Sequence, residues 1–316
     1  MRIIEWNSQG AFRKKNDRIL SLQPDILVVS ECESENKLKF GELTPKPTDF
    51  FWYGDSENKG IGIFSFSDYK FELLKIFNPR FRFIIPLKVM GKDSSFLLFA
   101  IWAMDNNKKP EARYIGQIWL AINYYSNLLS LPCVLTGDFN SNRIWDEKER
   151  VGNHSDMVAF LKKEKIFSLY HKQENIEQGK EIHPTYHMYR KTDKPYHIDY
   201  FFASDLIIKD GFKISIGKAE NWIDLSDHVP LTLELKIKTR LDKFNDSFSD
   251  FLTIKLNGLS TDTQTRFTDT IADLIEKAKK IDNLNSSIEN LKRREQLIIK
   301  YEKLFEIDKL INELNE

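Results

Sequence analysis

The first 238 residues alternate short apolar runs with turn-forming residues and stretches of helical periodicity, and this alternation limits the possible folds. Runs rich in β-branched and aromatic residues predict strands at 3–6, 26–30, 60–65, 83–89, 95–102, 133–137, 198–203 and 231–237. Arg80 and Arg82 alternate with Phe81 and Phe83, the pattern of a half-buried strand. Apolar residues at helical spacing predict helices at 15–22, 112–129 and 155–163. The order of these elements predicts a mixed α/β layered domain.

The composition changes near residue 239, where Gly and Trp become rare and Leu, Ile, Lys, Glu and Asn dominate. Capping-box spacing in this segment predicts helices at 262–281 and 287–314. Their apolar residues recur at intervals of three, four or seven, which is typical of a helical hairpin or a short coiled coil. We therefore divide the chain into a domain over 1–238 and a C-terminal α-helical extension over 239–316.

The charge balance gives no general attraction to nucleic acid or to an anionic membrane, because 47 Lys and Arg residues equal 47 Asp and Glu residues. Attraction to phosphate must then come from a local patch or from a bound metal. No apolar run is long enough for a membrane helix, and the strand expected at 3–6 leaves no room for a signal peptide. Cys32 and Cys133 lie in apolar runs and are expected to be reduced core thiols. We expect a cytoplasmic protein that does not contact membranes.

Seven polar side chains lie at the ends of different expected strands. They are Asn7, Glu31, Asp138, Asn140, Asp199, Asp227 and His228. One such residue alone is usually a turn or cap residue. Together, their carboxylate and amide oxygens suit Mg²⁺ or Mn²⁺, and an Asp that orients a His is the arrangement of hydrolytic triads. Hydrolysis of a phosphate ester needs a centre that neutralises charge, which the metal would supply, and a general base, which such a His would supply.

Six short motifs carry a family resemblance. They are W-N at 6–7, S-E at 30–31, Y-x-x-Q-x-W at 114–119, T-G-D-F-N at 136–140, H-I-D-Y at 197–200 and S-D-H-V-P-L at 226–231. In this order the chain resembles the endonuclease/exonuclease/phosphatase superfamily, which includes exonuclease III and pancreatic deoxyribonuclease. The resemblance covers residues 1–238. It implies a four-layer α/β sandwich with two packed mixed β-sheets, whose strand ends converge on one cleft.

The resemblance also implies a metal site. Glu31, helped by Asn7, would hold the principal Mg²⁺ or Mn²⁺ ion. Asp227 would aid this ion directly or through a water molecule.

The resemblance implies four catalytic residues as well. Asp138 would position or deprotonate the attacking water, and Asn140 would hold the phosphate. Asp199 would orient His228, which would serve either as a base or as a proton donor to the phosphoryl oxygen. Both roles for His228 stay open.

Three further residues are candidates for substrate binding. Trp102 stands where many family members carry His or Tyr, and its indole N–H either binds phosphate or simply packs in the core. His197 stands where some members carry Arg or Lys. His187 lies in a polar loop expected to border the cleft, although surface histidines usually have no such role.

The sequence thus predicts a metal-dependent phosphodiesterase, with a nuclease acting on DNA or RNA as the leading reading. One alternative is a phosphatase or phosphodiesterase that acts on a phospholipid or a small phosphorylated metabolite. Against a phospholipid substrate, we find no membrane anchor or exposed apolar loop in the sequence, and the aromatic run at 50–53 is more readily a core strand. A second alternative is an assembly protein with an inactive catalytic domain, but the intact set of side chains argues against it. The extension is a candidate for homodimerisation or for binding a partner protein.

Overall fold

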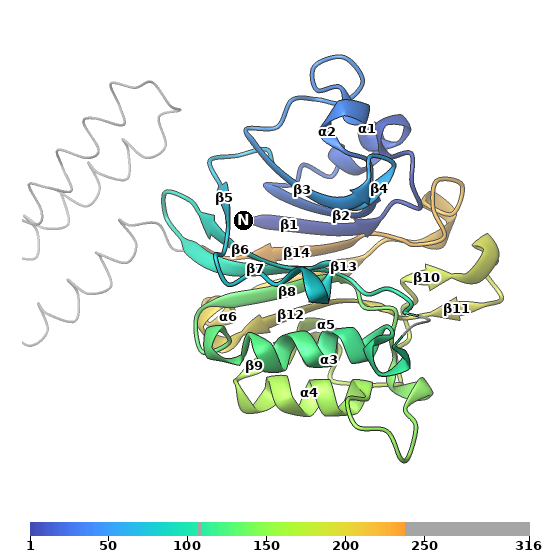
Figure 1. The fold of residues 1–316 in the computed structure, drawn as a ribbon. Coiled ribbons are helices and arrows are strands. Elements are labelled where there is room, and N and C mark those ends of the chain that lie inside the picture. Colours follow the sequence, from blue (N-terminus) through green and yellow to red (C-terminus); the bar gives the residue numbers. More distant parts are fainter. Residues whose placement is uncertain (107–108, 238–316) are drawn as a thin grey trace, which may run out of the picture. The chain divides into compact units, whose positions relative to one another are not determined.

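Two mixed β-sheets pack face to face in the computed structural model, which describes residues 1–106 and 109–237 (Figure 1). Each sheet has six strands, and helices lie on the outer faces. This is the four-layer α/β sandwich predicted from the sequence. The predicted helices at 262–281 and 287–314, and the coiled coil that they would form, lie outside the described residues.

The first sheet has the strand order β13-β14-β1-β2-β4-β3. Its strands are β1 (Arg2–Asn7), β2 (Ile26–Cys32), β3 (Asp49–Ser56), β4 (Lys59–Ser65), β13 (Phe212–Ile216) and β14 (Leu231–Leu235). β1 and β2 are parallel, and the other neighbours are antiparallel. The short helices α1 (Asn16–Leu20) and α2 (Glu35–Leu38) lie beside its outer face (Figure 1).

The second sheet has the order β5-β6-β7-β8-β12-β9. Its strands are β5 (Lys70–Leu73), β6 (Ile84–Met90), β7 (Ser95–Trp102), β8 (Cys133–Asp138), β9 (Ile166–Ser168) and β12 (Asp199–Ser204). β7 and β8 are parallel, and β12 runs antiparallel to β8. The helices α3 (Ile115–Tyr124) and α4 (His154–Lys163) cover its outer face (Figure 1).

Smaller elements lie in the segments between these strands. They are the helices α5 (Leu169–Glu174) and α6 (Asp205–Ile208), and the paired strands β10 (Tyr186–His187) and β11 (Pro195–Tyr196). Single 3₁₀ turns occupy Phe12–Lys14, Pro79–Phe81, Pro110–Ala112, Ser126–Leu128, Arg143–Trp145, Met188–Arg190 and Ala219–Asn221. Among the described residues, no helix has the length and apolar character needed to cross a bilayer.

The central strands bury both of their faces, because side chains alternate between the inter-sheet layer and the outer helical layers. In β1, Ile3 packs between the sheets while Ile4 packs under the outer layer. In β7, Leu98 packs between the sheets and Phe99 packs toward α3 and α4. This two-sided burial explains why these strands read as continuous apolar runs. Cys32 and Cys133 are buried free thiols, as predicted.

Some boundaries differ from the sequence-based expectation. The helix predicted at 112–129 is interrupted, since α3 covers only Ile115–Tyr124 and Tyr114 before it has a φ of 46°. The predicted half-buried strand around Arg80 is wrong. Pro79 begins a 3₁₀ turn there, and the side chain of Asn78 accepts a hydrogen bond from the backbone N–H of Arg80. The run at 50–53 does form a strand, but it is half-buried at the edge of the first sheet.

Candidate active site

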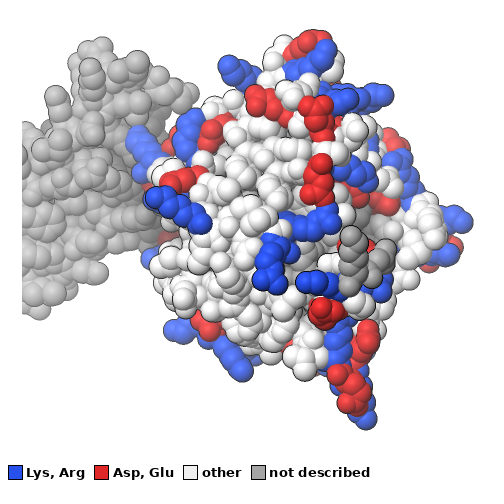
Figure 2. Space-filling view, in the orientation of Figure 1, with Lys and Arg blue, Asp and Glu red and all other residues white. Residues whose placement is uncertain are grey.

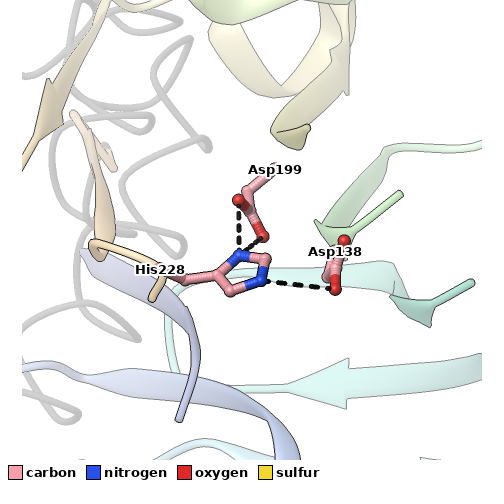
Figure 3. A group of neighbouring side chains, drawn as sticks. All are labelled: Asp138, Asp199 and His228. Carbon is pink, nitrogen blue, oxygen red and sulfur yellow. Dashed lines mark hydrogen bonds and ion pairs between the residues drawn. The ribbon is translucent and has the colours of Figure 1, made fainter. Parts of the chain in front are cut away.

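Asp138, Asp199 and His228 meet at one end of the sandwich (Figure 3). One ligand atom of each lies within 4.8 Å of the others. Asp138 ends β8 and Asp199 begins β12, and the antiparallel pairing of these strands makes the two residues direct register partners. His228 reaches them from the segment that precedes β14 in the other sheet. Both sheets therefore contribute to one buried cluster.

The imidazole of His228 lies between the two carboxylates (Figure 3). Its Nδ1 is 2.9 Å and 3.1 Å from the two carboxylate oxygens of Asp199. Its Nε2 is 3.9 Å from Oδ2 of Asp138, which is too long for a hydrogen bond. The backbone N–H of His228 donates to Ser226 Oγ at 3.1 Å, and its carbonyl accepts from the indole N–H of Trp6 at 3.0 Å. The ring is thus held with Nε2 directed toward Asp138.

Asp138 is held by two amide side chains. Asn7 Nδ2 and Asn140 Nδ2 each donate to Asp138 Oδ2 at 2.9 Å, and the backbone N–H of Asn140 donates to Oδ1 at 2.9 Å. Asn140 has a φ of 45°, in the left-handed region that Asn tolerates better than most residues. These contacts restrict the carboxylate to one orientation.

Burial and like charge change the proton affinities in this cluster. Burial, with a further contribution from Asp199, raises the pKa of Asp138 to about 7. Burial alone would lower the pKa of His228, but the carboxylates of Asp199 and Asp138 outweigh it and raise that pKa to about 9. At neutral pH the imidazole is therefore protonated, and Asp138 is poised to gain or lose a proton.

The metal-free protein should lose stability between pH 7.5 and 9.5. A His whose pKa is raised by folding stabilises the fold fully below its unfolded pKa of about 6.5, and this contribution is lost as pH rises through the folded value of about 9. We expect the free energy of unfolding to fall by roughly 1–2 kcal/mol over this range, which lies above the pKa of Asp138. Urea unfolding at both pH values would measure it. An equal loss in His228→Gln would contradict the assignment to this imidazole.

Glu31 and Asp227 lie beside this cluster. Glu31 has a φ of 58° and sits at a bulge in β2, where the register with β4 shifts between Ser30 and Cys32. Its carboxylate is 2.5 Å from Lys59 Nζ. Such a backbone conformation is costly for Glu, and the bulge sets the direction of its side chain.

The carboxylate of Asp227 is the second one beside the cluster. Its Oδ2 accepts a hydrogen bond from Gln9 Nε2 at 2.8 Å. Burial raises the pKa of Asp227, and the nearby charge of Glu31 adds to the rise. Oδ1 of Asn7, the third predicted ligand, accepts from the backbone N–H of Gln9 at 3.0 Å. Gln9 thus links Asn7 to Asp227, and the role of Asn7, Glu31 and Asp227 as metal ligands stays a prediction.

The three predicted substrate contacts are all buried. Trp102 is 5% exposed and packs its ring on Phe83, with 4.8 Å between ring centroids. His187 donates its backbone N–H to the carbonyl of Asp227 at 2.7 Å. Their contact with substrate stays a prediction.

His197 has a packing role of its own. Its ring lies 4.6 Å from that of Tyr170 and 4.9 Å from that of Tyr200. Burial lowers the pKa of His197 to about 4, so it is neutral at physiological pH. It therefore cannot replace the positive charge of the Arg or Lys that some family members carry there, and its contact with substrate also stays a prediction.

Sequence reasoning missed four residues that support the site. Gln9 lies two residues after Asn7, and Ser226 directly precedes Asp227 in the S-D-H motif, so this proximity was the available signal. The ring of Tyr186 packs against that of His228 with 4.7 Å between centroids and a tilt of 43°. Lys59 pairs with Glu31 from the start of β4. Nothing local in the sequence distinguishes Lys59 from other turn lysines.

Charges of both signs are mixed on one face of the protein. On the face in Figure 2, Lys and Arg side chains are interspersed with Asp and Glu side chains, around a broad uncharged area. This face shows no large patch of one sign. This mixture agrees with the net charge of +0.

The comparisons with known proteins identify a family and a fold. The sequence model of the Endonuclease/Exonuclease/phosphatase family matches residues 4–228. A 3′–5′ exonuclease, NExo from Neisseria meningitidis, is 18% identical, with a TM-score of 0.50 over 75% of this chain and 100% of that chain. A structure of NExo from Neisseria, described as a 3′ phosphatase bound to product DNA hairpin, is 18% identical, with a TM-score of 0.52 over 75% of this chain and 99% of that chain. An AP endonuclease from Archaeoglobus fulgidus is 16% identical, with a TM-score of 0.53 over 75% of this chain and 100% of that chain. At these identities the likeness shows a shared fold. No curated protein matches the chain.

Proposed function

Because this chain belongs to the Endonuclease/Exonuclease/phosphatase family, we propose that it is a divalent-metal-dependent phosphodiesterase that hydrolyses DNA or RNA. The observation that carries the proposal is the convergence of Asp138, Asp199 and His228. The similar structures are described as an exonuclease, a phosphatase bound to a DNA hairpin and an endonuclease, which supports a nucleic acid as the substrate here.

The donor set beside the cluster fits a hard divalent cation. Glu31 and Asp227 offer carboxylate oxygens, and Asn7 offers an amide oxygen, the ligand types that Mg²⁺ and Mn²⁺ prefer. These three residues would hold the ion. When bound, it would neutralise charge on the phosphoryl oxygens and on the leaving oxygen.

Asp138 and His228 would have different roles in the reaction, one as a proton acceptor and the other as a hydrogen-bond donor. Asp138, with a pKa of about 7, would accept a proton from the attacking water. His228, held protonated by Asp199, would donate a hydrogen bond from Nε2 to a phosphoryl oxygen. The 3.9 Å between Nε2 and Asp138 Oδ2 is too long for direct bonding, and it leaves both groups available to substrate or water.

The proposal is tested by incubating the full chain with Mg²⁺ or Mn²⁺ and a panel of substrates: plasmid DNA, single-stranded DNA, RNA, sphingomyelin and inositol phosphates. We expect cleavage of a nucleic acid that stops on addition of a chelator and returns with excess metal. Turnover confined to the lipid or to the inositol phosphates would overturn the nuclease assignment. Cleavage that persists in the chelator would overturn the metal dependence.

Replacing Lys59 by Met should tighten metal binding. The ammonium of Lys59 now neutralises Glu31 at 2.5 Å, so an incoming cation must displace it. Since an exposed pair of this kind contributes about 0.2–1 kcal/mol, we expect the dissociation constant for Mn²⁺ to fall by roughly two- to fivefold. Calorimetry without substrate would measure it. Lys37→Met, which removes an exposed charge from α2, controls for net charge, and equal changes in both variants would contradict the specific effect.

A further inference from the structure

A cavity of about 700 Å³ opens beside Asn140 and extends away from the buried cluster. Its walls include Tyr186, Tyr196, Trp145, Arg113 and Arg150. A cavity of this size is in the range that accepts a small organic ligand. The cavity adjoins Asn140, for which the family resemblance implies a role in holding the phosphate. A group bound in the cavity would then be attached to the reacting phosphate or lie next to it.

A series of aromatic rings leads from the catalytic imidazole into this cavity. Tyr186 lies 4.7 Å from His228, and Tyr196 is stacked on Tyr186 at 6.4 Å. Trp145 lies 5.2 Å from Tyr196 with an interplanar angle of 41°. These rings come from three segments that are distant in the sequence. The pairing of β10 with β11, an isolated bridge between Tyr186 and His228, and the 3₁₀ turn Arg143–Trp145 bring them together.

The ring of Trp145 is exposed yet held in place. It is 47% exposed, although a large apolar ring is usually buried. The side chain of Asn142 accepts a hydrogen bond from Ile144 N at 3.0 Å, which stabilises the turn. Asp146, the next residue, accepts from the backbone N–H groups of His154 and Ser155 at the start of α4. An indole on a fixed turn, with one side against Tyr196, offers exposed ring surface on which a flat ligand can stack.

Polar groups in the same cavity can recognise the edge of such a ligand. Arg113 is positioned by Asp105 at 2.7 Å, and Arg150 by Glu147 at 3.7 Å. Arg150 also donates to the backbone carbonyl of Arg113 at 3.5 Å. A nucleotide has these properties, because its flat base has hydrogen-bonding edges and is attached through the sugar to a phosphate.

We propose that this cavity binds an unpaired nucleobase next to the scissile phosphate, with the base stacked on Trp145. This inference rests on the proposed function and names its substrate class. A base inside a duplex is stacked and paired, so it must leave the helix before it enters a cavity. The enzyme therefore acts on single strands, or on strands with a locally unpaired nucleotide, in preference to continuous duplex.

The test compares Trp145→Ala with wild type on one labelled strand, presented alone or paired. Wild type cleaves the single strand faster than the duplex. Trp145→Ala raises KM for the single strand by roughly 5- to 100-fold, the value of one stacked base, with little change in kcat. Trp145→Phe restores most of the loss. Tyr124→Ala, which removes a ring that is 45% exposed on α3, leaves KM unchanged.

A binding measurement separates this inference from the proposed function. In Asp138→Ala, the fluorescence anisotropy of a labelled single-stranded oligonucleotide reports affinity without cleavage. We expect the added Trp145→Ala change to weaken this affinity by a similar factor. If wild type cleaves single strands and duplex equally well, or if Trp145→Ala changes neither KM nor this affinity, the cavity assignment is overturned while the nuclease stands. If no nucleic acid is cleaved but the oligonucleotide still binds through Trp145, the nuclease assignment fails alone.

Discussion

Asp138→Ala and His228→Ala should each lower the rate of phosphodiester cleavage by roughly 100-fold or more. Asp138 is the carboxylate to which two amide side chains donate hydrogen bonds, and no other acidic group in the described part of the chain occupies its position opposite His228 Nε2. Without His228, the carboxylate of Asp199 loses its imidazole partner. Single-turnover rates at saturating metal would measure both losses.

A matched control is Asp17→Ala, which removes an exposed carboxylate from α1 and should retain the wild-type rate. Each variant should also be melted, because removing a buried carboxylate leaves the amide donors of Asn7 and Asn140 without an acceptor. The rates are then compared for folded protein. Undiminished turnover in both active-site variants would show that another enzyme in the preparation does the chemistry.

Gly137→Ala should destabilise the fold by roughly 3 kcal/mol or more. Gly137 has a φ of 135°, which residues with a side chain rarely adopt. A Cβ built there would lie 1.9 Å from the backbone carbonyl oxygen of Ile101 in the neighbouring strand β7, and this oxygen has no flexible side chain that can move away. The midpoint of urea unfolding would measure the loss.

Gly41→Ala separates the two causes of this cost. Gly41 also has a positive φ, 84°, but a Cβ there would have nothing within 4 Å. It should cost only about 1 kcal/mol, the penalty of the left-handed backbone alone. If both variants lose the same stability, the contact with Ile101 does not matter and close packing between β7 and β8 is not the reason for glycine at 137.

The strands that carry the site could be predicted from sequence because they are buried on both faces and end in polar residues. β7 was expected at its observed bounds, and β8 ends at Asp138 within one residue of the expectation. Aliphatic and aromatic runs of this kind have few alternatives to a central strand. The meeting of the polar residues at their ends could also be predicted, because a sandwich brings the ends of neighbouring strands together.

Features set by distant parts of the chain could not be predicted. The bulge that turns Glu31 depends on how β4 pairs with β2, and nothing near Glu31 in the sequence encodes it. The strands β5, β9 and β13 are short and lie at the edges of their sheets, so each pairs with one neighbouring strand. Trp145 appears as an ordinary loop residue until Tyr196 is placed beside it. Local patterns carry no information about such pairings.

Under the proposed function, the direct pairing of Asp138 with Asp199 should make catalysis sensitive to strand alignment. Side chains alternate along a strand, so a slip of β12 by one residue would turn Asp199 away from the imidazole and put Tyr200 in its place. A misaligned molecule would be inactive and not merely slower. Activity divided by total protein should therefore report the fraction of molecules whose sheet formed correctly, which gives a refolding experiment a direct chemical readout.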